Sequence, residues 1–100
     1  MATLIKNNNG QVKNIKNLGW LVRNSSRVKE LEVVKLYTEA YKAELVAYMD
    51  NGDRYGQFFS SWDVLWNWLT TRRSLYGLPI RVYRGGYDGG LMTVKKDMRW

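Results

Sequence analysis

The sequence predicts an α+β fold of two layers, in which an antiparallel sheet of four or five strands carries two helices on one face. An aromatic stretch over residues 58–79 has helical spacing and recognisable ends, and three strand-like runs precede it. The dipeptide Asn51-Gly52 marks a tight hairpin between the last two of these runs. The predicted order is α-β-β-β-α-β, with a final strand left open.

Size and composition limit the class of protein. One hundred residues, of which 45% are apolar and 14% aromatic, are enough for one domain with a hydrophobic core over residues 1–100. The absence of cysteine excludes disulfides and thiolate metal sites. No apolar run approaches the roughly 20 residues of a membrane span, and no signal-peptide pattern opens the chain. We therefore expect a cytoplasmic protein without a membrane segment.

The positive charge is unevenly distributed. The formal net charge is +7; residues 1–29 carry +6 without any acidic residue, residues 30–53 carry −4, and the remainder carries +5. A basic end beside an acidic hairpin produces an oriented field that can steer an anionic partner.

The N-terminal part predicts one helix. Residues 1–12 are polar and rich in asparagine, and they form either a frayed terminus or a short strand with a turn. Asn14 is a plausible N-cap, and apolar residues then recur at helical spacing as far as residue 24. We expect a helix over about 15–24 that the polar residues 24–26 end.

Two strand-like runs and a hairpin follow. Residues 28–38 are apolar on both faces, which indicates a central strand, and residues 41–49 alternate. A two-residue type I′ turn at Asn51-Gly52 would place Tyr48 opposite Tyr55 and Leu45 opposite Phe58. The helices would then cover the face with Leu45, and both tyrosines would lie on the other face.

The stretch over 58–79 predicts the main helix. Ser60 suits the N-cap with Asp63 at N3, Arg72 and Arg73 fall in the last turn, and Gly77 suits the position after the C-cap. The apolar arc of this helix is wide; its members are Trp62, Val64, Leu65, Trp66, Trp68 and Leu69. This arc either forms the core alone or leaves its edge, at Val64 or Trp66, open to a partner.

The C-terminal part predicts further strands. Residues 80–84 have strand character, and residues 85–90 are a glycine-rich flexible connection. Residues 91–95 return as an edge strand or belong, with the rest of 85–100, to the connection and tail.

The sequence lacks the residues that most enzymes use. Without histidine or cysteine, the commonest general base, thiol nucleophile and metal ligands are missing. Glu30, Glu32 and Glu44 could meet across adjacent strands, but such a group is typical of a solvated face. We therefore expect no enzymatic activity, no metal and no cofactor.

Binding of an anionic partner is the first functional hypothesis. Arginine recognises phosphate and tyrosine stacks on bases, so basic residues interleaved with aromatic ones favour a nucleic acid or a nucleotide. The candidate ligand-binding residues are Tyr48, Arg54, Tyr55, Arg81, Tyr83 and Arg84.

A protein partner is the alternative. The segments NLGWLVRN (17–24) and SSWDVLWNWLTTRRSLYGLP (60–79), with the hairpin between them, resemble small accessory proteins of bacteriophages of the host-takeover or counter-defence type. The resemblance implies an inhibitor that binds and occludes a host protein, such as a defence nuclease. Trp66 and Trp20 would then belong to the protein interface, and a homo-oligomer remains open.

Overall fold

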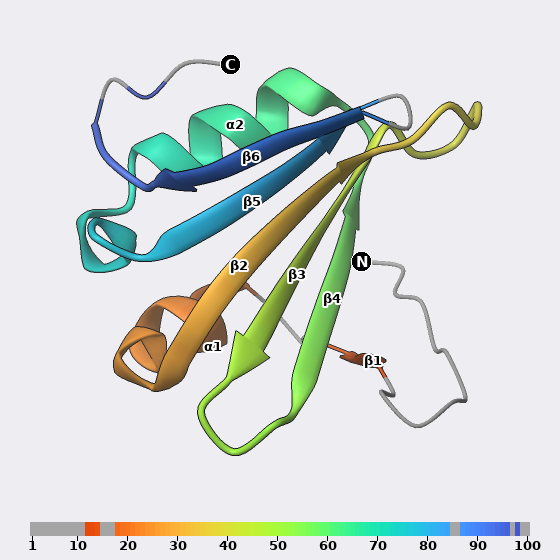
Figure 1. Cartoon of the computed structure of the whole chain (residues 1–100). Coiled ribbons are helices and arrows are strands. Elements are labelled where there is room, and N and C mark those ends of the chain that lie inside the picture. Colours follow the sequence, from red (N-terminus) through yellow and green to blue (C-terminus); the bar gives the residue numbers. More distant parts are fainter. Residues whose placement is uncertain (1–11, 15–17, 85–86, 97, 99–100) are drawn as a thin grey trace.

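The computed structural model of the chain describes residues 12–14, 18–84, 87–96 and 98. Six strands form one sheet in the spatial order β1-β4-β3-β2-β5-β6 (Figure 1). The strands are β1 (Val12–Asn14), β2 (Val28–Lys35), β3 (Ala43–Met49), β4 (Arg54–Phe59), β5 (Pro79–Arg84) and β6 (Tyr87–Thr93). The helices are α1 (Leu18–Arg23) and α2 (Trp62–Thr70), and the short 3-10 helices are η1 (Ser25–Arg27) and η2 (Arg73–Leu75).

The predicted α+β class is confirmed, whereas the purely antiparallel sheet is wrong. β2 pairs with β3, β3 with β4, and β5 with β6 in antiparallel fashion, but β1 runs parallel to β4 and β5 runs parallel to β2. The short strand β1 occupies the outer edge of β4. The chain returns through α2 to the other side of the sheet, where β5 joins β2. The sheet is therefore mixed, and α2 supplies the crossover connection that a parallel strand needs.

Several element boundaries differ from those expected. The first helix is described over Leu18–Arg23, so it ends one residue before the predicted 15–24, whose residues 15–17 lie outside the described part of the chain, as do residues 1–11. β6 begins at Tyr87, inside the segment expected as a flexible connection, and it forms an edge strand on β5.

The β3–β4 hairpin has a different register from the predicted one. Tyr48 pairs with Arg54 and Ala47 pairs with Tyr55, so the predicted pairing of the two tyrosines is wrong by one residue. The Gly52 N–H donates to the Met49 carbonyl at 3.1 Å, and Gly52 has φ +91° while no non-glycine residue has positive φ in the described chain. The loop therefore has three residues and a left-handed glycine, which is the next hairpin class after the two-residue turn.

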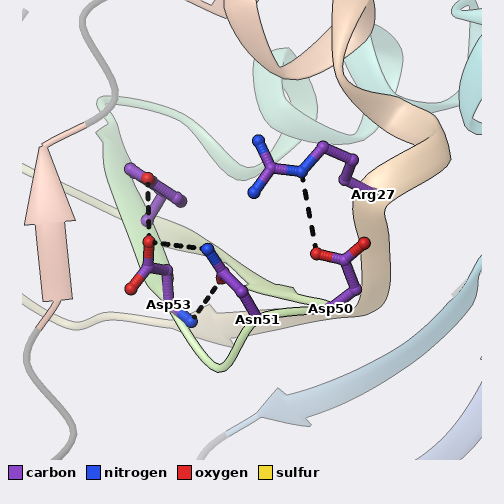
Figure 2. A network of polar contacts seen from close by, with 5 residues as sticks. Arg27, Asp50, Asn51 and Asp53 are labelled. Carbon is purple, nitrogen blue, oxygen red and sulfur yellow. Dashed lines mark hydrogen bonds and ion pairs between the residues drawn. The ribbon is translucent and has the colours of Figure 1, made fainter.

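Contacts outside the hairpin hold this longer loop. The Asp50 N–H donates to the Arg27 carbonyl at 2.8 Å, and the Asp50 carboxylate lies 3.6 Å from the Arg27 Nε. Within the loop, the Asn51 side-chain oxygen accepts from the Asp53 N–H at 3.0 Å (Figure 2). The loop is thus tied to the start of β2.

The core lies between the helices and one face of the sheet. Leu21 of α1, together with Leu65 and Leu69 of α2, is fully buried against alternate residues of the central strands. The sheet residues of this cluster include Leu31, Val33, Ala43, Leu45, Ala47, Met49, Phe59, Ile80 and Val82. Both helices therefore contribute to one layer, on the face that carries Leu45.

The main helix ends earlier than the sequence suggested. Ser61, not Ser60, is the N-cap, and its side-chain oxygen accepts from the Asp63 and Val64 N–H groups. The helix stops at Thr70, so the two arginines that follow lie in the connection to β5. No helix in the described part of the chain combines the length and the apolar character needed to cross a membrane.

Candidate functional site

The sheet face that the helices leave uncovered carries four of the predicted site residues. Register places Tyr48 beside Arg54, and places Arg81 and Tyr83 on the same face two strands away. We call this surface the open sheet face; it is defined by Glu30, Glu32, Glu44, Tyr48, Arg54, Arg81 and Tyr83. The three glutamates come from the central strands β2 and β3.

The cations of the open sheet face have partners on that face. The Arg81 Nε lies 3.5 Å from the Glu30 Oε2, and the Arg54 guanidinium lies 5.1 Å from the centre of the Tyr48 ring. The Tyr48 hydroxyl donates to the Glu32 Oε1 at 2.9 Å. An open depression of about 260 Å³ is lined by Lys29, Glu30, Glu32, Tyr48, Arg81 and Tyr83. The lining of this depression therefore contains two carboxylates, Glu30 and Glu32, and two cations, Lys29 and Arg81.

The environment of Tyr48 also disfavours a further negative charge. Burial, the hydrogen bond to Glu32 and the charge of Glu32 raise the pKa of Tyr48 from 10.0 to about 12, although Arg54 lowers it. The hydroxyl thus stays protonated and continues to donate to the carboxylate. Despite the three glutamates, no group of three acidic residues suited to holding a metal ion occurs in the part of the chain described.

Two predicted site residues are not part of the open sheet face. Tyr55 lies on the helix-covered face, where its ring packs on that of Trp20 with centroids 4.7 Å apart. The register shift is the reason, because moving a strand by one residue turns each side chain to the opposite face. Arg84 ends β5, and its side chain lies outside the described residues.

The two tryptophans proposed for a protein interface are both half-buried. Trp20 packs on Tyr55 as described. The Trp66 ring stacks on Trp62 with centroids 5.6 Å apart and planes 11° apart, and its Nε1 donates to the Met98 carbonyl at 3.0 Å. Val64 of α2 is the most exposed apolar residue of this helix, with 55% of its surface accessible.

A second surface lies at the C-terminal end of α2, and sequence reasoning did not identify it. It is a groove of about 460 Å³, which we call the α2 groove, lined by Asn67, Thr70, Thr71, Arg73, Tyr76 and Lys96. Its two charged residues, Arg73 and Lys96, are both cationic and exposed, and no carboxylate belongs to the described lining.

Hydroxyl groups shape the helical wall of the α2 groove. The Thr70 hydroxyl donates to the Trp66 carbonyl at 2.9 Å, and the Thr71 hydroxyl donates to the Asn67 carbonyl at 2.8 Å. The Tyr76 hydroxyl donates to the Thr70 carbonyl at 2.7 Å. The last turn of a helix normally presents unpaired carbonyls and a partial negative charge. The Thr71 and Tyr76 hydroxyls pair two of those end carbonyls, those of Asn67 and Thr70, which reduces the repulsion that an anion would meet there.

Backbone pairing brings the two cations of the α2 groove together. The Gly77 N–H donates to the Val94 carbonyl at 2.9 Å, and the Val94 N–H donates to the Leu78 carbonyl at 2.9 Å. These bonds extend the β5–β6 pairing, so the segment after η2 runs beside the segment before Lys96. The sequence pattern that could have indicated this site is a pair of basic doublets, 72–73 and 95–96, at the two ends of the β5–β6 unit.

Comparison with known protein families, curated proteins and solved structures found no match to this chain. The function of this chain is therefore inferred from the open sheet face and the α2 groove.

Proposed function

We propose that this protein is a non-enzymatic binding protein that holds an anionic partner, a nucleic acid or a nucleotide, in the α2 groove. The observation that carries the proposal is the pair of exposed cations, Arg73 and Lys96, in a groove whose described lining contains no carboxylate. The sequence has neither histidine nor cysteine, which supports binding rather than catalysis. We expect it to act in the cytoplasm.

The lining residues would have distinct roles toward a phosphate. The guanidinium of Arg73 can donate two parallel hydrogen bonds to phosphate oxygens, and the ammonium of Lys96 adds a point charge. The exposed side-chain amide of Asn67 can donate a further hydrogen bond. The hydroxyls of Thr70 and Thr71 already donate to backbone carbonyls, so the two cations would supply most of the attraction.

The residues first predicted for this role would contribute less. Arg81 lies close to Glu30, and Arg54 lies over the Tyr48 ring, so a phosphate on the open sheet face would have to compete with existing partners and approach Glu32. Binding there would require displacement of intramolecular contacts. We therefore propose that Tyr48, Arg54, Arg81 and Tyr83 play at most an accessory part.

A salt titration tests the proposal. Affinity for single-stranded RNA and DNA is measured at several salt concentrations, and the logarithm of affinity should fall by roughly 0.7 per neutralised phosphate for each unit of log salt. Arg73→Ala and Lys96→Ala should each weaken binding and flatten the slope by about one contact. Arg81→Ala is the matched control on the open sheet face, and it should leave both quantities unchanged.

Two results would overturn the assignment. Equal losses in Arg73→Ala and Arg81→Ala would move the site away from the α2 groove. Absence of binding to RNA, DNA and common nucleotides at low salt would remove the anionic partner altogether.

The surface around Val64 favours a second candidate function, inhibition of a host protein. Val64 is an apolar side chain with 55% of its surface exposed, and α2 also carries the half-buried Trp62–Trp66 stack. Tryptophan is enriched among the residues that dominate protein interfaces. If the protein occludes a nuclease, Val64→Asp should abolish inhibition of that purified enzyme while Arg73→Ala leaves it intact. The reverse pattern would exclude this surface.

A further inference from the structure

Arg72 is held in place by two contacts beside the α2 groove. Its guanidinium lies over the ring of Trp68, with 5.5 Å between the Cζ atom and the ring centroid, and its Nη1 donates to the Thr71 Oγ1 at 3.0 Å. Thr71 is itself a lining residue of the groove. Arg72 is nevertheless exposed. A guanidinium plane is thus fixed at the rim of a cationic groove.

The ring beneath Arg72 is anchored to the core. Trp68 is half-buried and packs on Phe59, with centroids 6.4 Å apart and an angle of 46° between the planes. Phe59 is only 8% exposed. A support of this kind reduces the rotamer freedom that a long arginine side chain would otherwise lose on binding a ligand.

We infer that Arg72, supported by Trp68, is a stacking platform for a nucleobase, and that the α2 groove accordingly binds a nucleotide unit. The base lies on the outer face of the guanidinium, and the phosphate lies against Arg73 and Lys96. Arginine planes stack on bases in single-stranded nucleic acids, and the contact depends on the planar group rather than on charge alone. This inference rests on the proposed function and adds the chemical class of the ligand to it.

Other cation–π pairs of the described chain lack this combination. Lys35 lies 5.0 Å from the centre of the Trp62 ring, but an ammonium offers no plane for stacking. Arg54 lies over the Tyr48 ring on the open sheet face, and the hydroxyl of the same tyrosine donates to the Glu32 carboxylate, which would repel a phosphate. Arg72 differs from both because the groove beside it contains two cations and no carboxylate among its described lining residues.

The test compares ligands with and without bases. Binding is measured for a single-stranded oligodeoxyadenylate of about ten nucleotides and for an abasic deoxyribose-phosphate strand of equal length. Arg72→Lys keeps the charge and removes the plane. It should weaken binding of the oligodeoxyadenylate by about tenfold, which corresponds to the loss of one stacked base, and leave the abasic strand unaffected. Arg73→Ala should lower the affinity for both strands by the same factor.

The outcomes separate the inference from the proposed function. If Arg72→Lys changes neither affinity, or lowers both equally, while the wild type binds both strands, the stacking platform is wrong and the anion site stands. If the wild type binds neither strand and no mononucleotide, both fail. Since Arg72 is exposed, an unchanged unfolding midpoint in denaturant should show that the variant remains folded.

Titration with two free nucleotides identifies the source of the nucleotide unit. Adenosine monophosphate and triphosphate are titrated against the wild type and Arg72→Lys. A loss of about tenfold with the free nucleotides assigns the groove to a small nucleotide. A loss confined to the oligodeoxyadenylate assigns it to a single strand, whose neighbouring phosphates would add contacts to the exposed Lys95.

Discussion

The open sheet face and the α2 groove both contain cations and tyrosines, yet they differ in how the charges are arranged. On the open sheet face, Arg81 faces Glu30 and the Tyr48 hydroxyl donates to Glu32. In the α2 groove, Arg73 and Lys96 have no carboxylate beside them in the described lining. The number of basic residues therefore does not identify an anion site; their local partners do.

This difference suggests separate roles for the two surfaces. Pairs that satisfy each other contribute to the folded state and would lose those contacts if they bound a ligand. Cations without a carboxylate beside them contribute no ion pair to stability, and their positive potential attracts an anion. Substitutions on the open sheet face should accordingly change stability, and substitutions in the α2 groove should change binding.

The largest expected effect concerns the buried face of α2, the helix that also supplies part of the α2 groove. Leu69 is fully buried, so Leu69→Ala should lower the free energy of unfolding by about 2–5 kcal/mol through lost burial and the cavity left behind. Asn67→Ala, on the exposed wall of the same helix, should stay within about 0.5 kcal/mol of the wild type. Urea denaturation measures both. Equal losses would mean that the groove wall is buried in an assembly.

The next largest effect on stability is expected in the β3–β4 hairpin, whose register determines which side chains lie on the open sheet face. Gly52 has φ +91°, and a Cβ built there meets nothing within 4 Å, so the cost of Gly52→Ala comes from the backbone conformation alone. We expect about 1–2 kcal/mol of destabilisation. Gly52→Asn is the control, since asparagine tolerates this region better. A loss as large from Gly52→Asn as from Gly52→Ala would show that conformation is not the cause.

The pair formed by Tyr48 and Glu32 gives a smaller effect with a defined pH dependence. Tyr48→Phe removes a hydrogen bond to a carboxylate and should cost about 1 kcal/mol near neutral pH. The pKa of Tyr48 is raised to about 12, so above pH 10 an unfolded chain loses this proton while the folded chain keeps it. Stability from Tyr48 is therefore complete below pH 10 and is lost as the pH rises toward 12.

Denaturation of the wild type and Tyr48→Phe at pH 9 and pH 11 (values near either side of the ordinary pKa of about 10) checks this sign. The difference in stability between the two proteins should shrink at the higher pH. A difference that stays constant would mean that Tyr48 ionises as an ordinary tyrosine, and the hydrogen bond to Glu32 would then be without effect.

The sequence predicts the elements better than their contacts. The helical spacing around Leu65 and the alternation of residues 41–49 depend on local periodicity, and both elements form. The predicted register of the β3–β4 hairpin is wrong because Asn51-Gly52 is compatible with loops of two or three residues. The longer loop is held by Arg27, more than twenty residues away in sequence, and no local pattern reports that contact.

The candidate site escaped prediction for a related reason. Arg72 and Arg73 fitted the end of a helix, where cations complement the dipole, and the basic doublet at 95–96 lay beside an expected tail. Their meeting depends on the β5–β6 pairing and on the early stop of α2 at Thr70. Of the predicted binding residues, Tyr48, Arg54, Arg81 and Tyr83 share one face of the sheet, but the pattern of the sequence does not report their pairing with the glutamates of that face.

The smallest expected effect on stability comes from one arginine on each surface, Arg81 of the open sheet face and Arg73 of the α2 groove. Arg81 and Glu30 are each about one third exposed, at 34% and 35% of side-chain surface, so Arg81→Ala should cost no more than about 1 kcal/mol of stability. Arg73→Ala should cost nothing measurable, since Arg73 is exposed and the described lining of the α2 groove offers it no carboxylate. In binding, the order should reverse, with Arg73→Ala weakening an oligonucleotide and Arg81→Ala leaving it unchanged. If Arg81→Ala instead weakens binding without any loss of stability, the Glu30 pair does not restrain Arg81, and the open sheet face becomes the anion site.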